Sequence, residues 1–181
     1  MDNESWDRTY RSDGRVSGPS RLLHEHRDLL TGGKALDIAM GSGRNAVMLA
    51  SCGYDVTGID RSAEAVSLAD GYAQSSGVRL HAVQADALTY PVEADSFDLI
   101  ADFYFLERSL IPSLKQGLKK KGLIFFETYT TGQARFGRPR NPDYLLKPNE
   151  LLELFLDFFI LFYHERVETD RAVAGLIAQK V

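Results

Sequence analysis

The sequence predicts a doubly wound α/β fold, in which helices cover both faces of a mostly parallel sheet. Short apolar runs alternate with segments of helical pattern along most of the chain, which is typical of such a sheet. The first of these runs leads straight into a glycine-rich turn that opens a helix. The chain ends in two apolar runs joined by a short polar turn, which indicates an antiparallel strand pair.

Length and composition indicate one domain, which we expect to span residues 1–181. Hydrophobic residues make up 44% of the chain and charged residues 25%, which suits an ordinary globular protein. The formal net charge of −4 provides no basic excess for binding phosphates, so nucleic acid is not an expected partner.

Cysteine content and the absence of targeting signals favour a cytoplasmic protein. The single Cys52 cannot form an internal disulfide, and the acidic Met1–Glu4 is unlike a secretory signal. The most apolar stretch, Leu151–Tyr163, contains two acids and is too short to span a bilayer. We therefore expect no membrane partner.

The N-terminal half is predicted to supply three strands and three helices. A helix that begins at Pro19-Ser20 runs through Leu30. Ser62 suits the N-cap of a helix through Gln74. The other elements are strands at Ala35–Met40, Tyr54–Ile59 and Val78–Val83, and a helix at Asn45–Cys52.

The C-terminal half adds four strands and a long loop. We expect a kink at Pro112 in the first of its two helices. The loop Tyr129–Lys147 is polar and carries three arginines, and loops of this length are often functional. The strands are Phe97–Asp102, Leu123–Thr128, Phe158–Val167 and Ala172–Lys180, and the helices are Leu106–Leu118 and 148–156.

The glycine-rich turn after the first strand is typical of a nucleotide-type cofactor site. Gly41 and Gly43 allow a tight turn and let a ligand approach the backbone, and the helix start behind them offers unpaired N–H groups. Asp60 follows Gly41 by 19 residues, close to the spacing of an acid that holds a ribose.

Two cofactors are compatible with this turn. Gly41, Gly43 and Ala46 satisfy the dinucleotide fingerprint, so a nicotinamide-dependent reductase is one hypothesis. Asp37 in the first strand instead favours a cationic ligand, because its charge would repel a pyrophosphate. Asp86, after the third strand, could accept a hydrogen bond from the exocyclic amine of adenine.

Two stretches of the chain, residues 36–43 and 56–62, resemble the class I S-adenosylmethionine-dependent methyltransferases. The last stretch, residues 174–180, is similar to the reversed final strand of that family, which implies seven strands with an antiparallel last strand. Residues 6–11 and the 41–45 loop resemble its small tellurite-resistance-type or thiol-directed members. The implied cofactor is S-adenosylmethionine.

The resemblance also implies roles for the first two strand ends. Asp37 would support the loop and bind the ammonium end of the cofactor, and Gly41 and Gly43 would pack against its methionine part. Asp60 would bind the ribose hydroxyls through both oxygens.

By the same resemblance, the adenine would lie beside Arg61 and Ser62 and be read at its edge by Asp86 and Ala87. Acids are common in turns, so a purely structural role for Asp86 is an alternative.

At the end of the fourth strand, Asp102 and Phe103 would lie near the sulfonium and the acceptor, although Asp102 could instead cap a helix. The Asn-Pro-Pro-aromatic signature of base methylation is absent at residues 102–105, which argues against a nucleic-acid base as substrate.

The implied reaction is in-line transfer of a methyl group to a small-molecule acceptor such as a thiol or an oxyanion. Tyr104, Arg108 and Arg138 are candidates near the acceptor, and the two arginines are cations that would favour a charged acceptor. The 129–147 loop is hypothesised to cover the acceptor pocket, although its arginines could simply face solvent. A non-catalytic cofactor-binding regulator is the alternative from another class.

No metal is expected. His24 and His26 point to different faces of a predicted helix, so they cannot share a ligand site.

Overall fold

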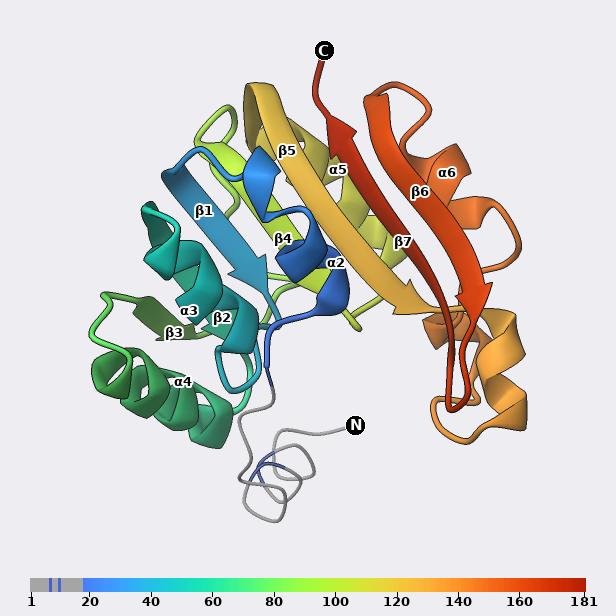
Figure 1. Cartoon of the computed structure of the whole chain (residues 1–181), viewed down its shortest axis with the longest axis horizontal. Helices are drawn as coiled ribbons and strands as arrows, with labels where there is room; N and C mark the ends of the chain where they lie inside the picture. Colours follow the sequence, from blue (N-terminus) through green and yellow to red (C-terminus); the bar gives the residue numbers. More distant parts are fainter. Residues whose placement is uncertain (1–6, 8–9, 11–17) are drawn as a thin grey trace.

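Seven strands form one sheet in the computed structural model of the protein (Figure 1), which describes Asp7, Tyr10 and residues 18–181. Their order across the sheet is β3-β2-β1-β4-β5-β7-β6. β1 to β5 are parallel, and β7 is antiparallel to both of its neighbours, so the predicted fold is confirmed. The strands are β1 (Gly33–Ile38), β2 (Tyr54–Asp60), β3 (His81–Gln84), β4 (Phe97–Phe103), β5 (Leu118–Tyr129), β6 (Phe159–Val167) and β7 (Ala172–Gln179).

Helices cover the sheet on both sides (Figure 1), and each side has its own apolar core. α2 (Arg21–Glu25), α3 (Arg44–Ser51) and α4 (Ala63–Ser75) lie on one side, and α5 (Ile111–Gly117) and α6 (Glu150–Leu154) lie on the other. Side chains alternate along β5, so Phe125 packs in the core beneath α2 and α3 while Phe126 packs against α5 and α6.

Burial distinguishes β7, inside the sheet, from its neighbour β6 at the edge. Every β7 residue from Ala172 to Ala178 is buried, because both faces and both edges of this strand are covered. β6 lies at the sheet edge and consists of exposed and half-buried residues. In the part of the chain that the structure describes, no helix is long and apolar enough to cross a membrane.

Two predicted helices are wrong in extent. The helix predicted from Pro19-Ser20 to Leu30 ends at Glu25, because His26 leaves the helical backbone (φ −111°, ψ 30°) and packs on Phe162, with the ring centroids 4.3 Å apart. Pro112 causes no kink, since it lies in the first turn of α5, where its missing N–H has no intrahelical partner.

The second of these helices, α5, begins at Ile111 and not at the predicted Leu106. A 3₁₀ turn, Arg108–Leu110, takes the place of its predicted first residues. The third strand is also shorter than predicted, because only His81–Gln84 pair with β2 at the sheet edge.

The predicted 129–147 loop contains short regular turns. It contains the 3₁₀ turns Thr131–Arg135 and Pro142–Tyr144. Its two ends lie side by side, because the amide of Leu146 donates to the carbonyl of Tyr129 at 2.9 Å and the amide of Thr131 donates to the carbonyl of Leu146 at 2.9 Å. The loop is therefore closed at its base beside the carboxyl end of β5.

Candidate functional site

The glycine turn between β1 and α3 has no room for side chains. Gly41 and Gly43 have φ values of 58° and 80°, in the region that favours glycine. A Cβ on Gly43 would lie 2.8 Å from the Cβ of Ala69, and one on Gly41 would lie 2.8 Å from the hydroxyl of Tyr10. The turn thus holds α3 close against α4.

Asp60 ties the end of β2 to this turn. Its Oδ2 accepts from the amide of Gly41 and its Oδ1 accepts from the amide of Ser62, each at 2.9 Å. Burial raises the pKa of Asp60, and the two amide donors oppose that rise. Each carboxylate oxygen has two lone pairs, so both retain capacity for a further donor such as a hydroxyl.

Asp37 is the buried acid of the site. It is 1% exposed, and its Oδ2 has no hydrogen-bond partner among the described residues. Burial raises its pKa to about 7, while the charge of Arg44 and a hydrogen bond from the amide of Ala46 oppose this. The hydrogen bond links Asp37 to the first turn of α3. A buried carboxylate oxygen beside a glycine turn fits the positively charged ligand that the sequence indicates.

Asp102 lies on the neighbouring strand but on the opposite face. Asp102 pairs with Ile38 across β1 and β4, so its side chain and that of Asp37 alternate to different sides of the sheet. Burial, followed by the charge of Asp37, raises its pKa, and it accepts a hydrogen bond from the amide of Phe105. Asp102 therefore lies inside β4 beside the turn that follows it, and the helix N-cap role that the sequence left open is wrong, because Glu107 caps the next turn. Phe103 is buried in the core beneath α2 and α3.

A surface hollow of about 230 Å³ marks the end of β3. Arg61 and Asp86 line it, with a guanidinium-to-carboxylate distance of 3.9 Å. Asp86 also accepts from the amide of Leu88 at 3.0 Å, which stabilises the turn, and Ala87 is buried beside it. The predicted adenine residues thus lie together, with the carboxylate of Asp86 half-exposed.

Ser62 and the N-terminal residues meet at the start of α4. The Ser62 hydroxyl accepts from the amide of Ala65 as the predicted N-cap, and it also donates to the carboxylate of Asp7. Tyr10 lies over Gly41, and burial, then the charge of Asp60, raises its pKa. Trp6, which belongs to the motif at residues 6–11, lies outside the described residues.

Arg108 anchors the 129–147 loop. Its guanidinium donates to both carboxylate oxygens of Glu150 at 2.6 and 3.0 Å, and to the carbonyls of Asp143 and Leu145 at 2.7 and 3.0 Å. These bonds occupy four of its five N–H groups. Arg138, in contrast, is exposed, and its carbonyl accepts from Gln133 at 3.2 Å.

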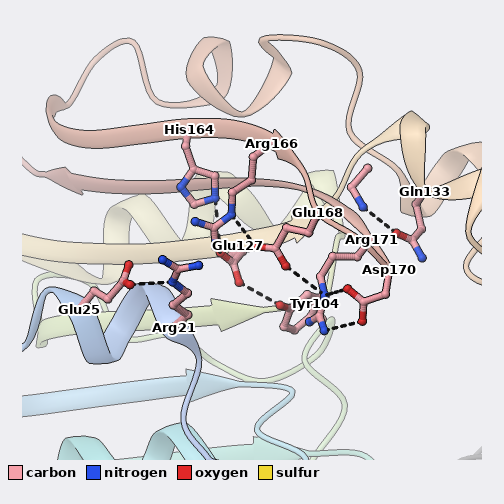
Figure 2. A network of polar contacts seen from close by, with 11 residues as sticks. Arg21, Glu25, Tyr104, Glu127, Gln133, His164, Arg166, Glu168, Asp170 and Arg171 are labelled. Carbon is pink, nitrogen blue, oxygen red and sulfur yellow. Dashed lines mark hydrogen bonds and ion pairs between the residues drawn. The ribbon is translucent and has the colours of Figure 1, made fainter.

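Tyr104 follows β4 directly and points to a buried acid on β5 (Figure 2). Its hydroxyl donates to Oε1 of Glu127 at 2.9 Å. Burial, then the charge of Glu127, raises the pKa of Tyr104 to about 12, so the phenol stays neutral at neutral pH. Its ring packs on Tyr129, with centroids 5.0 Å apart, and the guanidinium of Arg44 lies 5.6 Å from its centroid.

Sequence reasoning did not single out Arg44, Glu127 or His164. Arg44 opens α3 immediately after the glycine turn. Glu127 was visible as the one acid in the apolar strand predicted at Leu123–Thr128, a pattern that argues for a buried charge. His164 on β6 offered no such signal, because β6 is a mixed edge strand.

Comparison with known proteins finds similarity to methyltransferases. Residues 35–122 match the family described as "Methyltransferase domain". The ubiquinone biosynthesis O-methyltransferase of Actinobacillus pleuropneumoniae serotype 7 (strain AP76) is 33% identical over 122 residues, which cover 61% of this chain and 52% of that protein. The chain spans about half the length of the curated relatives it matches.

Solved structures agree on the fold. TehB from Haemophilus influenzae superposes with a TM-score of 0.80 at 18% identity, over 97% of this chain and 67% of TehB. A protein of echinomycin biosynthesis, described for conversion of a disulfide bond into a thioacetal group, gives a TM-score of 0.75 at 21% identity, over 98% of this chain and 92% of its own. These solved structures therefore share the fold of this chain, and residues 35–122 are similar to the methyltransferase domain family.

Proposed function

We propose that this protein transfers a methyl group from S-adenosylmethionine to a small-molecule acceptor. The observation that carries the proposal is the unpartnered Oδ2 of buried Asp37 beside the glycine turn. A buried carboxylate needs a cation or donors to be stable in its charged form. The ammonium group of this cofactor supplies both, whereas a pyrophosphate would be repelled.

The cofactor, when bound, supplies a methyl group already activated on a sulfonium. The chain's residues would then bind and orient it. Asp37 would accept from the ammonium group, Gly41 and Gly43 would let the methionine part lie on the backbone, and Asp60 would accept from the ribose hydroxyls. The hollow at the end of β3 supports the adenine role of Arg61, Asp86 and their neighbours Ser62 and Ala87.

An oxygen acceptor is the more specific part of the proposal. Relatives at 32–35% identity are named for O-methylation in ubiquinone biosynthesis, and the matched residues cover about half of each relative. Tyr104 supports an acceptor position at the end of β4, where a phenol and Arg44 lie together. Positioning alone contributes roughly 7–11 kcal/mol to such bimolecular reactions.

The proposal includes one domain over residues 1–181, acting in the cytoplasm without nucleic acid. A single sheet that continues from β1 through β7, residues 33–179, supports the domain assignment. The acidic net charge of −4 supports the absence of nucleic acid.

Calorimetric titration with S-adenosylhomocysteine and with a nicotinamide dinucleotide tests the cofactor. We expect binding of the first alone, and nicotinamide binding without S-adenosyl binding would refute the proposal in favour of the reductase. Transfer of a labelled methyl group to a panel of phenols and thiols tests the reaction. Cofactor binding without any transfer would favour the non-catalytic regulator.

A further inference from the structure

A polar cluster around one buried acid lies on the α2 side of the sheet, beyond the proposed cofactor residues. We call Tyr104, Glu127, His164, Arg166 and Arg171 the Glu127 cluster (Figure 2). Glu127 is 2% exposed, and its Oε2 has no hydrogen-bond partner among the described residues. A buried acid of this kind is costly unless charge or function compensates it.

The strands are shaped to hold this cluster. Glu127, Gly175 and His164 lie opposite one another across β5, β7 and β6. A Cβ on Gly175 would lie 2.6 Å from Cε1 of His164 and 3.3 Å from Oε2 of Glu127. Glycine at this position therefore leaves the space through which the imidazole approaches the carboxylate, with Nε2 and Oε2 3.5 Å apart.

Cationic groups surround the unpartnered oxygen. The guanidinium of Arg166 lies 3.9 Å from Oε2 of Glu127 and pairs with Glu168 at 2.7 Å. From α2, Arg21 faces the same carboxylate, and Glu25 faces Arg166. These groups place positive charge beside Oε2 of Glu127.

Tyr104 connects this acid to the cofactor turn. Its ring lies beside Arg44, the first residue of α3, and its hydroxyl donates to Glu127 at 2.9 Å. The guanidinium of Arg171 faces the same hydroxyl. A phenol oxygen has two lone pairs, so it can accept from a further donor on the side of the acceptor.

We propose that Tyr104 and Glu127 form a relay that removes the proton of an acceptor hydroxyl during methyl transfer. This inference rests on the proposed function. The acceptor oxygen gains the methyl group and passes its proton to the Tyr104 oxygen, while the Tyr104 proton moves to Oε1 of Glu127. The electron pair of the broken carbon–sulfur bond stays on sulfur. Tyr104 touches the acceptor, and Glu127 acts through it.

Two phenols that differ in acidity test the relay. We expect Glu127→Gln to lower kcat/KM at pH 7 about 100-fold for 4-methylphenol, which needs a base. The loss should be less than threefold for 4-nitrophenol, which ionises readily in solution. Tyr104→Phe should give the same pattern. Glu93→Gln and Tyr72→Phe, on the exposed β3–β4 loop and on α4, are matched controls that should leave both rates unchanged.

Equal losses for the two phenols would overturn the relay, because a structural role does not depend on acceptor acidity. No loss in either variant would also overturn it. If the wild-type protein methylates neither phenol, the proposed oxygen acceptor fails, and the relay fails with it. S-adenosylhomocysteine binding by each variant shows that it is folded.

A titration without cofactor or acceptor gives a second readout. Phenolate absorbance is measured after rapid pH jumps in the wild type and in Tyr104→Phe. The difference between the two signals reports the ionisation of Tyr104. Its pKa, about 12 in the wild type, should fall by about one unit in Glu127→Gln, because the neighbouring negative charge is removed. An unchanged pKa would show that Glu127 does not act on Tyr104.

Discussion

The proposed cofactor region and the Glu127 cluster both lie toward the carboxyl ends of the parallel strands, but they are built differently. The proposed cofactor region uses the successive ends of β1, β2 and β3, with backbone amides and residues close in sequence. The Glu127 cluster combines the turn after β4, the end of β5, the second half of β6 and the turn just before β7. The first is a local motif, and the second exists only once distant strands pair.

The reversal of β7 explains the second arrangement. Because β7 is antiparallel, its first residues, and not its last, meet the carboxyl ends of β5 and β6. Arg171 therefore reaches Tyr104 from just before β7 begins. We therefore expect the local motif to keep its geometry when other parts of the chain change, whereas the geometry of the Glu127 cluster depends on the register of several strands.

The largest expected effect is on the local motif. Gly43→Ala should lower the free energy of unfolding by about 3 kcal/mol, from positive-φ strain and the 2.8 Å contact with Ala69. Chemical denaturation measures this. Gly71→Ala on α4, where a Cβ meets nothing within 4 Å, is the matched control and should stabilise by about 0.5–1 kcal/mol. Two changes of the same sign and size would contradict the steric argument.

The next effect concerns the charge of Asp37. Asp37→Asn should weaken S-adenosylhomocysteine binding about 30-fold, near 2 kcal/mol, because the ammonium group loses its buried partner. Because the pKa of Asp37 is about 7, the carboxyl group is protonated at lower pH and must lose that proton before it can bind a cation. Wild-type affinity should therefore rise with pH up to about 7 and then level off.

Calorimetry across this pH range checks both parts of the Asp37 prediction. The variant should bind without this pH dependence, and exposed Asp70→Asn on α4 should behave as the wild type does. A wild-type affinity that is constant from pH 5 to 8 would show that Asp37 does not face the ammonium group.

A smaller effect should appear in the acceptor region. Arg108→Ala should destabilise the protein by about 1–2 kcal/mol, because Glu150 and two carbonyls lose their donor at a partly exposed site. Amide hydrogen exchange should accelerate at residues 141–147. Arg138→Ala should change neither stability nor exchange. If Arg138→Ala instead abolishes turnover with cofactor affinity intact, the role near the acceptor that the sequence predicts for Arg138 is supported.

The smallest effect is expected at the half-exposed Asp86. Asp86→Asn should weaken S-adenosylhomocysteine binding by twofold to fivefold, because solvent competes for the adenine amine. The inosine analogue, which lacks that amine, should bind the variant and the wild type equally. A loss of the same size with the analogue would assign Asp86 to the turn alone.

Local patterns made the fold and the glycine turn predictable, while the cofactor roles of the site residues stay a prediction. Apolar runs, the glycine turn and the Ser62 cap each depend on residues a few positions apart, and the structure has them in place. The face of Asp102 was not predictable, because it depends on the register of β4 against β1. Arg108 could not be recognised as an anchor, since its partner Glu150 lies 42 residues away.

Gly175 on β7 and His164 on β6 constrain which residues can occupy each other's positions. Any side chain at 175 would occupy the volume that the imidazole of His164 now fills, so a bulkier residue there requires a smaller one at 164. The pair thus gives a rule for sorting relatives by sequence. Chains with glycine at 175 and histidine at 164 can keep the buried acid and its neighbour together, whereas chains that have changed one position alone must have rebuilt this part of the sheet.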